Sequence, residues 1–435
     1  MKNSRRHFIR KAAGSAAAFA LLPTIVPASA LGRMGRPAPG DRLVIAAIGM
    51  GSMGTANTHS FLAKPEVQIA AVCDLDKGRL EDARNLVNGR YRNSDCRVYS
   101  DYRELLEKES VDAVTIATPD HWHALLSVAC ANKGLDIYGE KPLARSVVEG
   151  RAIADAVARN QRIWQTGSWQ RSLENFHRGC ELVINGRIGK VNYVEVGLPD
   201  GRPSIGTPPV MEVPEGLNWD FWLGPAPKVP YRGISHWDWR WIMDYSGGQL
   251  TDWAGHHIDI AHWGLGFDRT GPLSVEGEGI YPREGIFDVP VEYDFICEYP
   301  GGVRMRVANS SRLPKGMGTV WYGDRGWLFV DRGDKLEASD PEILKEKIGD
   351  DEIRLYRSRD HHQNFLDCVR SRKETITPAD IALRSISVGL IGEIAMLTGQ
   401  KLFWNAEKER FTNSDEANRL LVKPYRKPLD HSMIF

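Results

Sequence analysis

The sequence predicts an α/β protein whose first domain is built on a parallel, doubly wound sheet. Two observations support this fold class. From Leu43 to about Gly167, short apolar segments alternate with longer helical ones, as in parallel strands covered on both faces. Beyond Gly167 the alternation stops, and strands with apolar residues at every second position appear between prolines and glycines. We therefore expect a Rossmann-type domain over residues 41–166 and a second domain over residues 167–435.

The composition is that of an ordinary globular protein. The chain has 435 residues, 42% of them hydrophobic and 26% charged, which is enough for two domains with their own cores. Lys+Arg and Asp+Glu both number 56, so no basic surplus indicates nucleic acid or a polybasic membrane patch. The six cysteines form no C-x-x-C pair, so we expect neither a zinc cluster nor a disulfide framework.

The first 30 residues read as a targeting segment. Arg5 and Arg6 lie in "SRRHFIR", an apolar stretch follows from Ala12 to Val26, and an A-x-A cleavage signal comes next. The stretch is too short and too interrupted by prolines to span a membrane, and no lipoprotein cysteine follows it. The segment resembles a bacterial twin-arginine signal, the alternative being a basic amphipathic leader of another type. We expect a signal over residues 1–30, a linker over 31–40, export by the twin-arginine machinery to the periplasm, and no stable membrane anchor.

The first strand leads into a glycine-rich turn. An apolar run from Leu43 to Ile48 ends in "GMGSMG", a G-x-G-x-x-G, and residues 55–63 then read as a helix. Gly49 permits the tight turn, Gly51 lets the backbone approach a pyrophosphate, and Gly54 allows the helix to pack closely on the strand. The free N–H groups of the helix would face the phosphates. The pattern predicts a dinucleotide site.

A carboxylate follows the second strand. "VQIAAVCD" is an apolar strand that ends in Asp74, about 25 residues after Gly49. A carboxylate at this place accepts hydrogen bonds from the adenosine ribose and repels a 2′-phosphate, which favours NAD over NADP. Asp74 can also serve as the N-cap of the helix predicted behind it, and both roles can coexist.

The alternation continues to the end of the first domain. Strands are predicted in "RVYSDY", "VDAVTIATP", "LDIYGEKPL" and "RIWQTGS", with helices between them. In such sheets ligands bind at the carboxyl ends of the strands. The Thr118-Pro119 turn and Lys141 both lie at such ends.

Several motifs together resemble those of the Gfo/Idh/MocA oxidoreductases. "AIGMGSMG", "VCD", "VTIATPDHWH", "YGEKPL", "GSWQRS" and "GGQLTDWAGHHIDIAHW" have the order and spacing of that family, and the likeness extends from Leu43 to the end. The resemblance implies a Rossmann domain followed by an α/β domain with a large, mostly antiparallel open sheet. One face of that sheet commonly mediates homodimers or homotetramers in relatives.

Lys141 is the first candidate for the chemistry. An ammonium stabilises a developing alkoxide and polarises a ketone, and Pro142 restricts the backbone of the lysine before it. The family's E-K-P lysine lies by the nicotinamide and bonds the reacting oxygen, so the resemblance assigns that role to Lys141. A surface lysine at a turn is the alternative.

Asp252 and His256 form the second candidate. On a helix, residues i and i+4 share a face, and a carboxylate beside an imidazole can orient it, select its tautomer and raise its pKa. The resemblance places both residues of D-x-x-x-H at the substrate, with the histidine as proton acceptor and donor. His257 points about 100° away and is a secondary candidate. His256 with Asp259 could instead hold a metal, or the helix could be purely structural; we expect acid/base chemistry and no metal.

The remaining candidates come with structural alternatives. More than half of the thirteen tryptophans lie between Trp219 and Trp263, and Trp239 with Arg240 is chosen there for substrate contact. Gln170 and Arg171 either contact the cofactor or form an interdomain ion pair. His123 follows the Thr-Pro turn and either lies by the cofactor or on a helix surface. The predicted cofactor-binding residues are Gly49, Met50, Gly51, Ser52, Met53, Gly54, Asp74, Thr118, Pro119, His123, Glu140, Lys141, Gln170 and Arg171. The predicted substrate contacts are Lys141, Trp239, Arg240, Asp252, His256 and His257.

These residues predict an NAD-dependent oxidoreductase that acts on a carbohydrate or glycoside hydroxyl. Because the periplasm is expected to offer no free NAD, the cofactor would travel tightly bound and be restored in place. A redox-neutral NAD-dependent glycosidase is one alternative, and a non-catalytic secreted sugar-binding protein is another. The sequence does not name the sugar or the electron acceptor.

Overall fold

The first sheet of the protein is parallel throughout, as predicted. The structure is a computed structural model that describes residues 38–233 and 238–435, so the predicted signal and most of the predicted linker lie outside the described residues. The six strands lie in the order β3-β2-β1-β4-β5-β6. They are β1 (Leu43–Ile48), β2 (Val67–Cys73), β3 (Arg97–Tyr99), β4 (Ala113–Ile116), β5 (Asp136–Gly139) and β6 (Trp164–Thr166). Strand order reverses between β1 and β4, which is where sheets of this type bind ligands.

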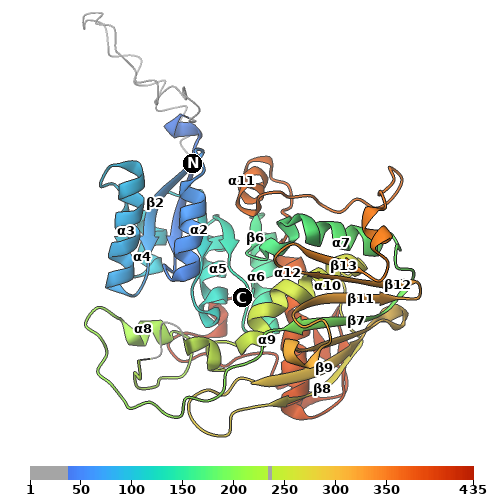
Figure 1. The fold of residues 1–435 in the computed structure, drawn as a ribbon. Helices are drawn as coiled ribbons and strands as arrows, with labels where there is room; N and C mark the ends of the chain where they lie inside the picture. The colour runs from blue at the N-terminus through green and yellow to red at the C-terminus, as the bar shows by residue number, and fades with distance from the viewer. Residues whose placement is uncertain (1–37, 234–237) are drawn as a thin grey trace, which may run out of the picture. The chain divides into compact units, whose positions relative to one another are not determined.

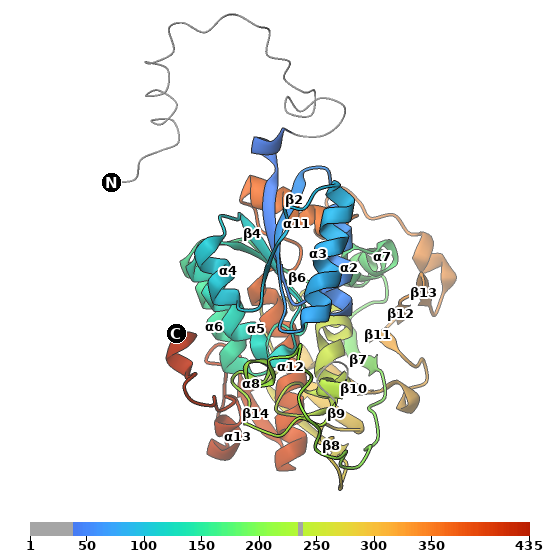
Figure 2. The same cartoon turned by 90° about the vertical axis from the view of Figure 1, so that its left-hand side faces the viewer.

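Helices cover both faces of this sheet. They are α2 (Ser52–Leu62), α3 (Lys77–Tyr91), α4 (Tyr102–Lys108), α5 (His123–Asn132) and α6 (Val147–Arg159). Figure 2 shows α2 and α3 on one side and α4, α5 and α6 on the other. The strands between them are apolar and buried, as a sheet covered on both faces requires. Helix α2 begins three residues earlier than predicted, directly after Gly51.

The second sheet is mixed and mostly antiparallel. Its order is β13-β12-β11-β7-β10-β9-β8-β14-β15, and only the β7–β10 pair is parallel among its paired strands in the described residues. The strands are β7 (Val191–Leu198), β8 (Ser274–Ile280), β9 (Glu292–Glu298), β10 (Arg304–Asn309), β11 (Gly318–Gly323), β12 (Gly326–Asp331), β13 (Lys335–Ala338), β14 (Leu402–Asn405) and β15 (Arg410–Phe411). In β9, exposed Glu292 is followed by alternating buried and half-buried residues, which is the pattern of a sheet with one covered face. The predicted fold class is confirmed.

Some helices of this half lie between the two sheets (Figure 1), and others pack on strands of the second sheet. The helices of this half are α7 (Glu174–Ile184), α8 (Trp219–Leu223), α9 (Gly248–Trp253), the π-helical turn η6 (Ala254–Ile258), α10 (Asp259–Leu265), α11 (His361–Ser371), α12 (Ala379–Thr398) and α13 (Asp415–Arg419). Short 3-10 turns are η2 (Pro39–Asp41), η3 (Asp120–Trp122), η4 (Trp169–Ser172), η5 (Asp238–Trp241), η7 (Pro300–Gly302), η8 (Ser310–Arg312), η9 (Pro341–Lys345) and η10 (His431–Met433). Phe365 of α11 packs edge-on against Phe61 of α2, so the later part of the chain returns to the first sheet.

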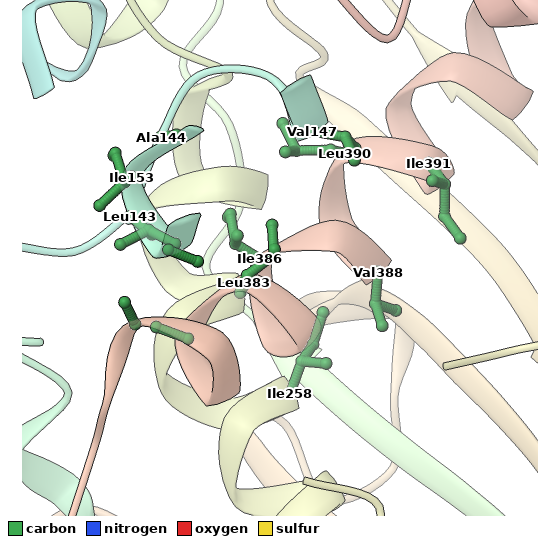
Figure 3. Packing of buried hydrophobic residues seen from close by; sticks show 14 of the residues in the cluster. Leu143, Ala144, Val147, Ile153, Ile258, Leu383, Ile386, Val388, Leu390 and Ile391 are labelled. Atoms are coloured by element: carbon green, nitrogen blue, oxygen red, sulfur yellow. The ribbon is translucent and has the colours of Figure 1, made fainter. Parts of the chain in front are cut away.

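Helix α12 joins the two halves. It is long and apolar enough to cross a membrane by length and composition, but most of its residues are buried inside the protein. Leu383 and Ile386 of α12, Val147 of α6 and Ile258 of η6 belong to one hydrophobic cluster (Figure 3). The residues from Leu43 onward form one compact unit. This shared core holds the carboxyl ends of the first sheet close to η6.

All six cysteines are buried and unpaired. The thiols of Cys96 and Cys130, for example, are buried in the first domain, one at the start of β3 and one in α5. The protein is therefore held together by its hydrophobic cores and hydrogen bonds, without a disulfide.

Candidate active site

A cavity of about 310 Å³ lies at the carboxyl ends of β1, β2, β4 and β5. It is the kind of crevice in which doubly wound sheets bind ligands. Predicted site residues that line it are Gly49, Met50, Gly51, Ser52, Met53, Asp74, Thr118, Pro119, Glu140, Lys141, Trp239, Arg240 and Asp252. The structure thus brings the glycine turn, the second-strand carboxylate and the Lys141 region into one cavity.

The glycine turn has the geometry that a bound pyrophosphate requires. Gly49 has φ of +85°, and a Cβ there would lie 2.6 Å from the Ala117 carbonyl oxygen. A Cβ on Gly54 would lie 1.8 Å from the Gly49 carbonyl oxygen, so the close packing predicted for Gly54 is present. Gly51 caps α2 without a side-chain hydrogen bond, which leaves the N–H groups of the first turn available to an anion. The turn fits a dinucleotide.

Asp74 lines the cavity beside this turn. Its carboxylate accepts hydrogen bonds from the backbone N–H groups of Met50 (2.6 Å) and Asp76 (3.0 Å). Burial raises the pKa of Asp74, and these two bonds and Arg79 oppose the increase. The N-cap of α3 is Asp76, which accepts from Arg79 N, so the N-cap role considered for Asp74 belongs to its neighbour. Arg79 also lines the cavity, although no sequence motif identifies it.

A segment of the second half of the chain covers the nucleotide end of the cavity. Leu217 forms an isolated antiparallel bridge with Asp76, and the Asn218 N–H donates to the Leu75 carbonyl at 3.4 Å. Leu217 and Phe221 line the cavity opposite the glycine turn. We call residues 214–223 the cover segment. Its first residues have no regular secondary structure and α8 is only five residues long, so no periodic pattern in the sequence predicts where the segment lies.

Lys141 and Asp252 meet at the other end of the cavity. Lys141 Nζ donates to Asp252 Oδ1 at 2.8 Å, and Arg240 Nε lies 3.7 Å from the same oxygen. Burial alone would raise the pKa of Asp252, but Lys141 and Arg240 hold it below its ordinary value. A Cβ on Gly255 would lie 3.3 Å from Lys141 Cβ, so the room left by this glycine is used by the lysine.

His256 lies in η6, next to this pair but not bonded to Asp252. Its ring is buried and contacts Trp253 and Trp169 edge-on, with ring centres 5.4 Å and 6.3 Å away. Nδ1 of His256 has no hydrogen-bond partner among the described residues. Burial, followed by Lys141 and Arg332, lowers the pKa of His256 well below its ordinary value. The expectation that Asp252 raises this pKa is wrong, because the carboxylate is bonded to Lys141 instead.

Gln170 and Arg171, both predicted to contact the cofactor, lie outside this cavity. Both side chains are buried and neither lines the cavity. Arg171 Nε bonds the Asp259 carboxylate at 2.6 Å, and its Nη2 bonds Asp268 at 2.8 Å. Arg171 therefore forms an ion pair, as the alternative proposed, but within the second domain and not between the two domains. Successive side chains of the 3-10 turn η4 point in different directions, and here Trp169 is the residue that faces His256.

His123 and His257 are also held away from the cavity. His123 places Nδ1 2.7 Å from the Pro142 carbonyl and Nε2 2.9 Å from the Thr118 carbonyl. It therefore ties the Thr-Pro turn to the Lys141 turn and acts through them, rather than as a direct contact. His257 is fully buried and stacks on Trp253, which contradicts its predicted contact with substrate. Burial, followed by Arg332, lowers its pKa to about 3.

The metal alternative finds no support in the arrangement of side chains. Asp259, considered as a ligand together with His256, bonds Arg171 and Ser385. No group of three or more His, Cys, Asp or Glu side chains within residues 38–233 and 238–435 could hold a metal ion.

The parallel sheet, the glycine turn and the cavity at the strand ends define a dinucleotide-binding α/β protein. A family model described as "Oxidoreductase family, NAD-binding Rossmann fold" matches residues 43–168, and one described as "Oxidoreductase family, C-terminal alpha/beta domain" matches residues 205–431. The chain belongs to the Gfo/Idh/MocA oxidoreductase family, as its motifs predicted. It is an enzyme of the oxidoreductase class with an NAD-binding Rossmann domain.

Individual relatives share modest identity. The chain is 27% identical over 383 residues to "Myo-inositol 2-dehydrogenase" of Thermotoga maritima, covering 86% of this chain and 98% of the relative. It is 31% identical over 180 residues to "Glycosyl hydrolase family 109 protein" of Shewanella pealeana, covering 37% of this chain and 38% of that one. A solved structure of similar fold is the WlbA dehydrogenase from Bordetella pertussis in complex with NADH and UDP-GlcNAcA. Its TM-score is 0.63 at 16% identity, and the match covers 84% of this chain and 99% of that one.

Proposed function

We propose that the protein oxidises a hydroxyl group of a carbohydrate or glycoside, with tightly bound NAD as the hydride acceptor. The observation that carries this proposal is the Lys141–Asp252 pair, which lies in the same cavity as the glycine turn. When bound, NAD supplies the acceptor for the hydride that leaves the carbinol carbon. The residues of the chain must then orient the substrate and handle its hydroxyl proton.

Lys141 holds and polarises the reacting oxygen. Its ammonium can donate a hydrogen bond to the hydroxyl and stabilise negative charge on that oxygen as the proton leaves. Asp252 aims the ammonium through the 2.8 Å bond. Asp252 is therefore a positioning residue in this proposal.

His256 takes the proton and returns it in the reverse reaction. Its lowered pKa keeps the imidazole neutral at neutral pH, so a ring nitrogen can accept a proton. Nδ1 has no partner among the described residues, which supports this role. His256 does not itself line the cavity, and in this proposal its contact with the reacting oxygen forms when substrate binds.

NAD is the proposed cofactor, with NADP the weaker choice, because the Asp74 carboxylate lies in the cavity beside the glycine turn. Tight retention is supported by the cover segment, since Leu217 and Phe221 line the cavity and Leu217 is bridged to Asp76. A sugar-like substrate is supported by the inositol dehydrogenase relative. Trp239, stacked under the Arg240 guanidinium at 4.4 Å, offers an aromatic face beside Asp252.

The test is to purify the protein without added cofactor, extract and weigh the bound nucleotide, and then add a panel of sugars and glycosides. We expect bound NAD(H), and at least one sugar that reduces the bound NAD. A purified protein that contains no NAD or NADP, and that binds neither when they are added, would contradict the proposal.

A redox-neutral glycosidase is a second candidate, supported by the similarity to a glycosyl hydrolase family 109 protein. In that reaction a sugar hydroxyl is oxidised, the aglycone leaves by elimination, water adds, and the ring is reduced again. It predicts release of aglycone with no net NADH. A simple dehydrogenase predicts the opposite, so the two are separated by measuring both products.

We further propose that residues 1–30 direct folded protein to the periplasm by the twin-arginine route. Replacing Arg5 and Arg6 by lysine should then retain the protein in the cytoplasm, as cell fractionation would show. We also propose a homodimer or homotetramer formed through the open face of the second sheet. Light scattering of the purified protein measures that state.

A further inference from the structure

Arg332 carries a positive charge that no described residue pairs with, close to the proposed reacting groups. It follows β12, and the central carbon of its guanidinium lies 4.5 Å from the ring centre of Trp169 and 4.2 Å from that of Trp253. Cation–π attraction to two rings holds the group in place. The N–H donors of a guanidinium lie in its plane, so stacking on aromatic faces leaves them available.

No acceptor among the described residues uses these donors. Nε of Arg332 is buried without a partner, and the side chain makes no hydrogen bond or ion pair within residues 38–233 and 238–435. Two carboxylates act on it through space, but Asp331 bonds Lys335 at 3.0 Å and Asp252 bonds Lys141 at 2.8 Å. Burial lowers the pKa of Arg332, which reflects the cost of holding this cation partly out of water.

The position of Arg332 is on the substrate side of the proposed site. Its charge contributes to the lowered pKa of His256, and both of its tryptophans contact the His256 ring. It does not line the nucleotide cavity. Trp169, Trp253 and Arg332 are all half-buried, so each presents part of its surface to solvent.

We propose that Arg332 binds a carboxylate on the substrate, so that the enzyme acts on a sugar acid such as a uronic acid or its glycoside. A guanidinium binds a carboxylate with two parallel hydrogen bonds, and the tryptophan faces suit the C–H face of the same sugar ring. Lys141 and Arg240 already lie at the Asp252 carboxylate, and Arg332 acts on it only through space, so the guanidinium of Arg332 can still bind a carboxylate of the substrate. This inference rests on the proposed sugar substrate.

The test compares matched neutral and acidic ligands. Calorimetry on the purified holoprotein would measure binding of methyl glucoside against methyl glucuronide, with the same pairs in the galacto and manno series. We expect at least one acid to bind about 10- to 100-fold more tightly than its neutral partner, as a charge-assisted, bidentate contact predicts. Arg332→Gln should remove that preference. Arg332→Lys should keep only part of it, because an ammonium cannot form the two parallel hydrogen bonds that a guanidinium makes to a carboxylate.

Arg419→Gln is the matched control, because Arg419 is exposed at the end of α13, and it should leave the preference for the acid unchanged. Thermal unfolding checks that each variant is folded. The inference is overturned if no acid is preferred in any series, or if the preference survives in Arg332→Gln. Hydride transfer from these ligands to bound NAD is measured separately by NADH absorbance. Binding with acid preference but no reduction of NAD by any ligand would contradict the proposed function and leave the role of Arg332 standing.

Discussion

Lys141 and Asp252 are joined by a 2.8 Å hydrogen bond, although 111 residues separate them in the chain. One follows β5 of the parallel sheet and the other lies in α9. Their side chains are 12% and 14% exposed, so both charges are largely removed from water and depend on one another. The pair fixes the position of the ammonium at the mouth of the nucleotide cavity.

Removing the ammonium should therefore stop the chemistry while leaving the cofactor in place. For Lys141→Met we expect the rate of reduction of bound NAD to fall by about 10²- to 10³-fold, the effect of losing one stabilising donor. Asp252→Asn should lower the same rate by a smaller factor, because Lys141 keeps its ammonium but loses the carboxylate that positions it. Stopped-flow absorbance of NADH measures both rates. Lys228→Met, at an exposed lysine, is the control. A Lys141→Met enzyme with the parental rate would exclude the role given to this residue.

Cofactor choice should depend on Asp74. Asp74→Asn retains an oxygen that can accept from the Met50 N–H but removes the negative charge. We expect the ratio of NADP to NAD affinity to rise about tenfold or more, because a 2′-phosphate would no longer be repelled and Arg79 could bind it. Fluorescence titration of protein freed of cofactor measures both affinities. If the ratio does not change, the carboxylate does not set the preference.

Cofactor retention should depend on the cover segment. Leu217→Ala and Phe221→Ala each remove apolar surface that faces the cavity. We expect NAD to dissociate about 10- to 100-fold faster from the double variant, as the loss of one buried and one half-buried apolar side chain predicts. Val213→Ala, an exposed position in the same region, is the matched control. The amount of NAD left after timed gel filtration gives the rate of dissociation. Equal retention in the parent protein, the double variant and the Val213→Ala control would show that the segment does not hold the cofactor.

Buried histidines predict acid sensitivity. Burial lowers the pKa of His121 and His262 to about 4, and that of His257 and His361 to about 3. An unfolded histidine has a pKa of about 6.5, so below that pH the unfolded chain binds more protons than the folded one. The contribution of these histidines to the free energy of unfolding therefore falls as the pH falls from about 6.5 to about 4, by roughly 1–2 kcal/mol per histidine at about pH 5. Buried carboxyls whose pKa is raised, such as Asp120 and Glu140, act in the opposite direction.

Urea unfolding at about pH 7 and about pH 5 measures this loss. His262→Gln removes one of these groups, while its amide can still bond the Tyr299 hydroxyl that His262 Nε2 contacts at 2.7 Å. This variant should lose less stability on acidification than the parent protein. Identical unfolding midpoints at both pH values would contradict the prediction.

The strand–helix alternation sufficed to predict the first sheet because parallel strands are buried on both faces and read as continuous apolar runs. The glycine turn was predictable for a related reason. The positive φ of Gly49 and the close contact of Gly54 with the Gly49 carbonyl both arise within one strand–turn–helix unit, so the local sequence indicates them. Lys141 follows a strand of the same sheet, which placed it at the correct edge.

Side-chain direction and long-range contacts were beyond the sequence patterns. Gln170 and Arg171 were chosen from "SWQRS", but η4 turns Trp169 toward His256 and buries the other two. Arg171 pairs with Asp259, which lies 88 residues away, and no local sequence motif at either residue predicts this contact. Arg332 lies in a tight turn between two strands, without a periodic pattern, and only the folded chain places it by Trp253.

The fold itself protects the six buried cysteine thiols from reaction. Burial raises the pKa of Cys96 to about 11 and that of Cys130 to about 12, so the native protein contains very little thiolate at neutral pH. Disulfide formation and exchange require thiolate, so oxidants should react only slowly with the cysteines of the folded chain. Unfolding in air would expose all six thiols to random pairing. A chain denatured in the presence of a reductant should refold when the denaturant is diluted. A chain denatured without reductant should form a mixture of non-native disulfide-linked species that does not refold.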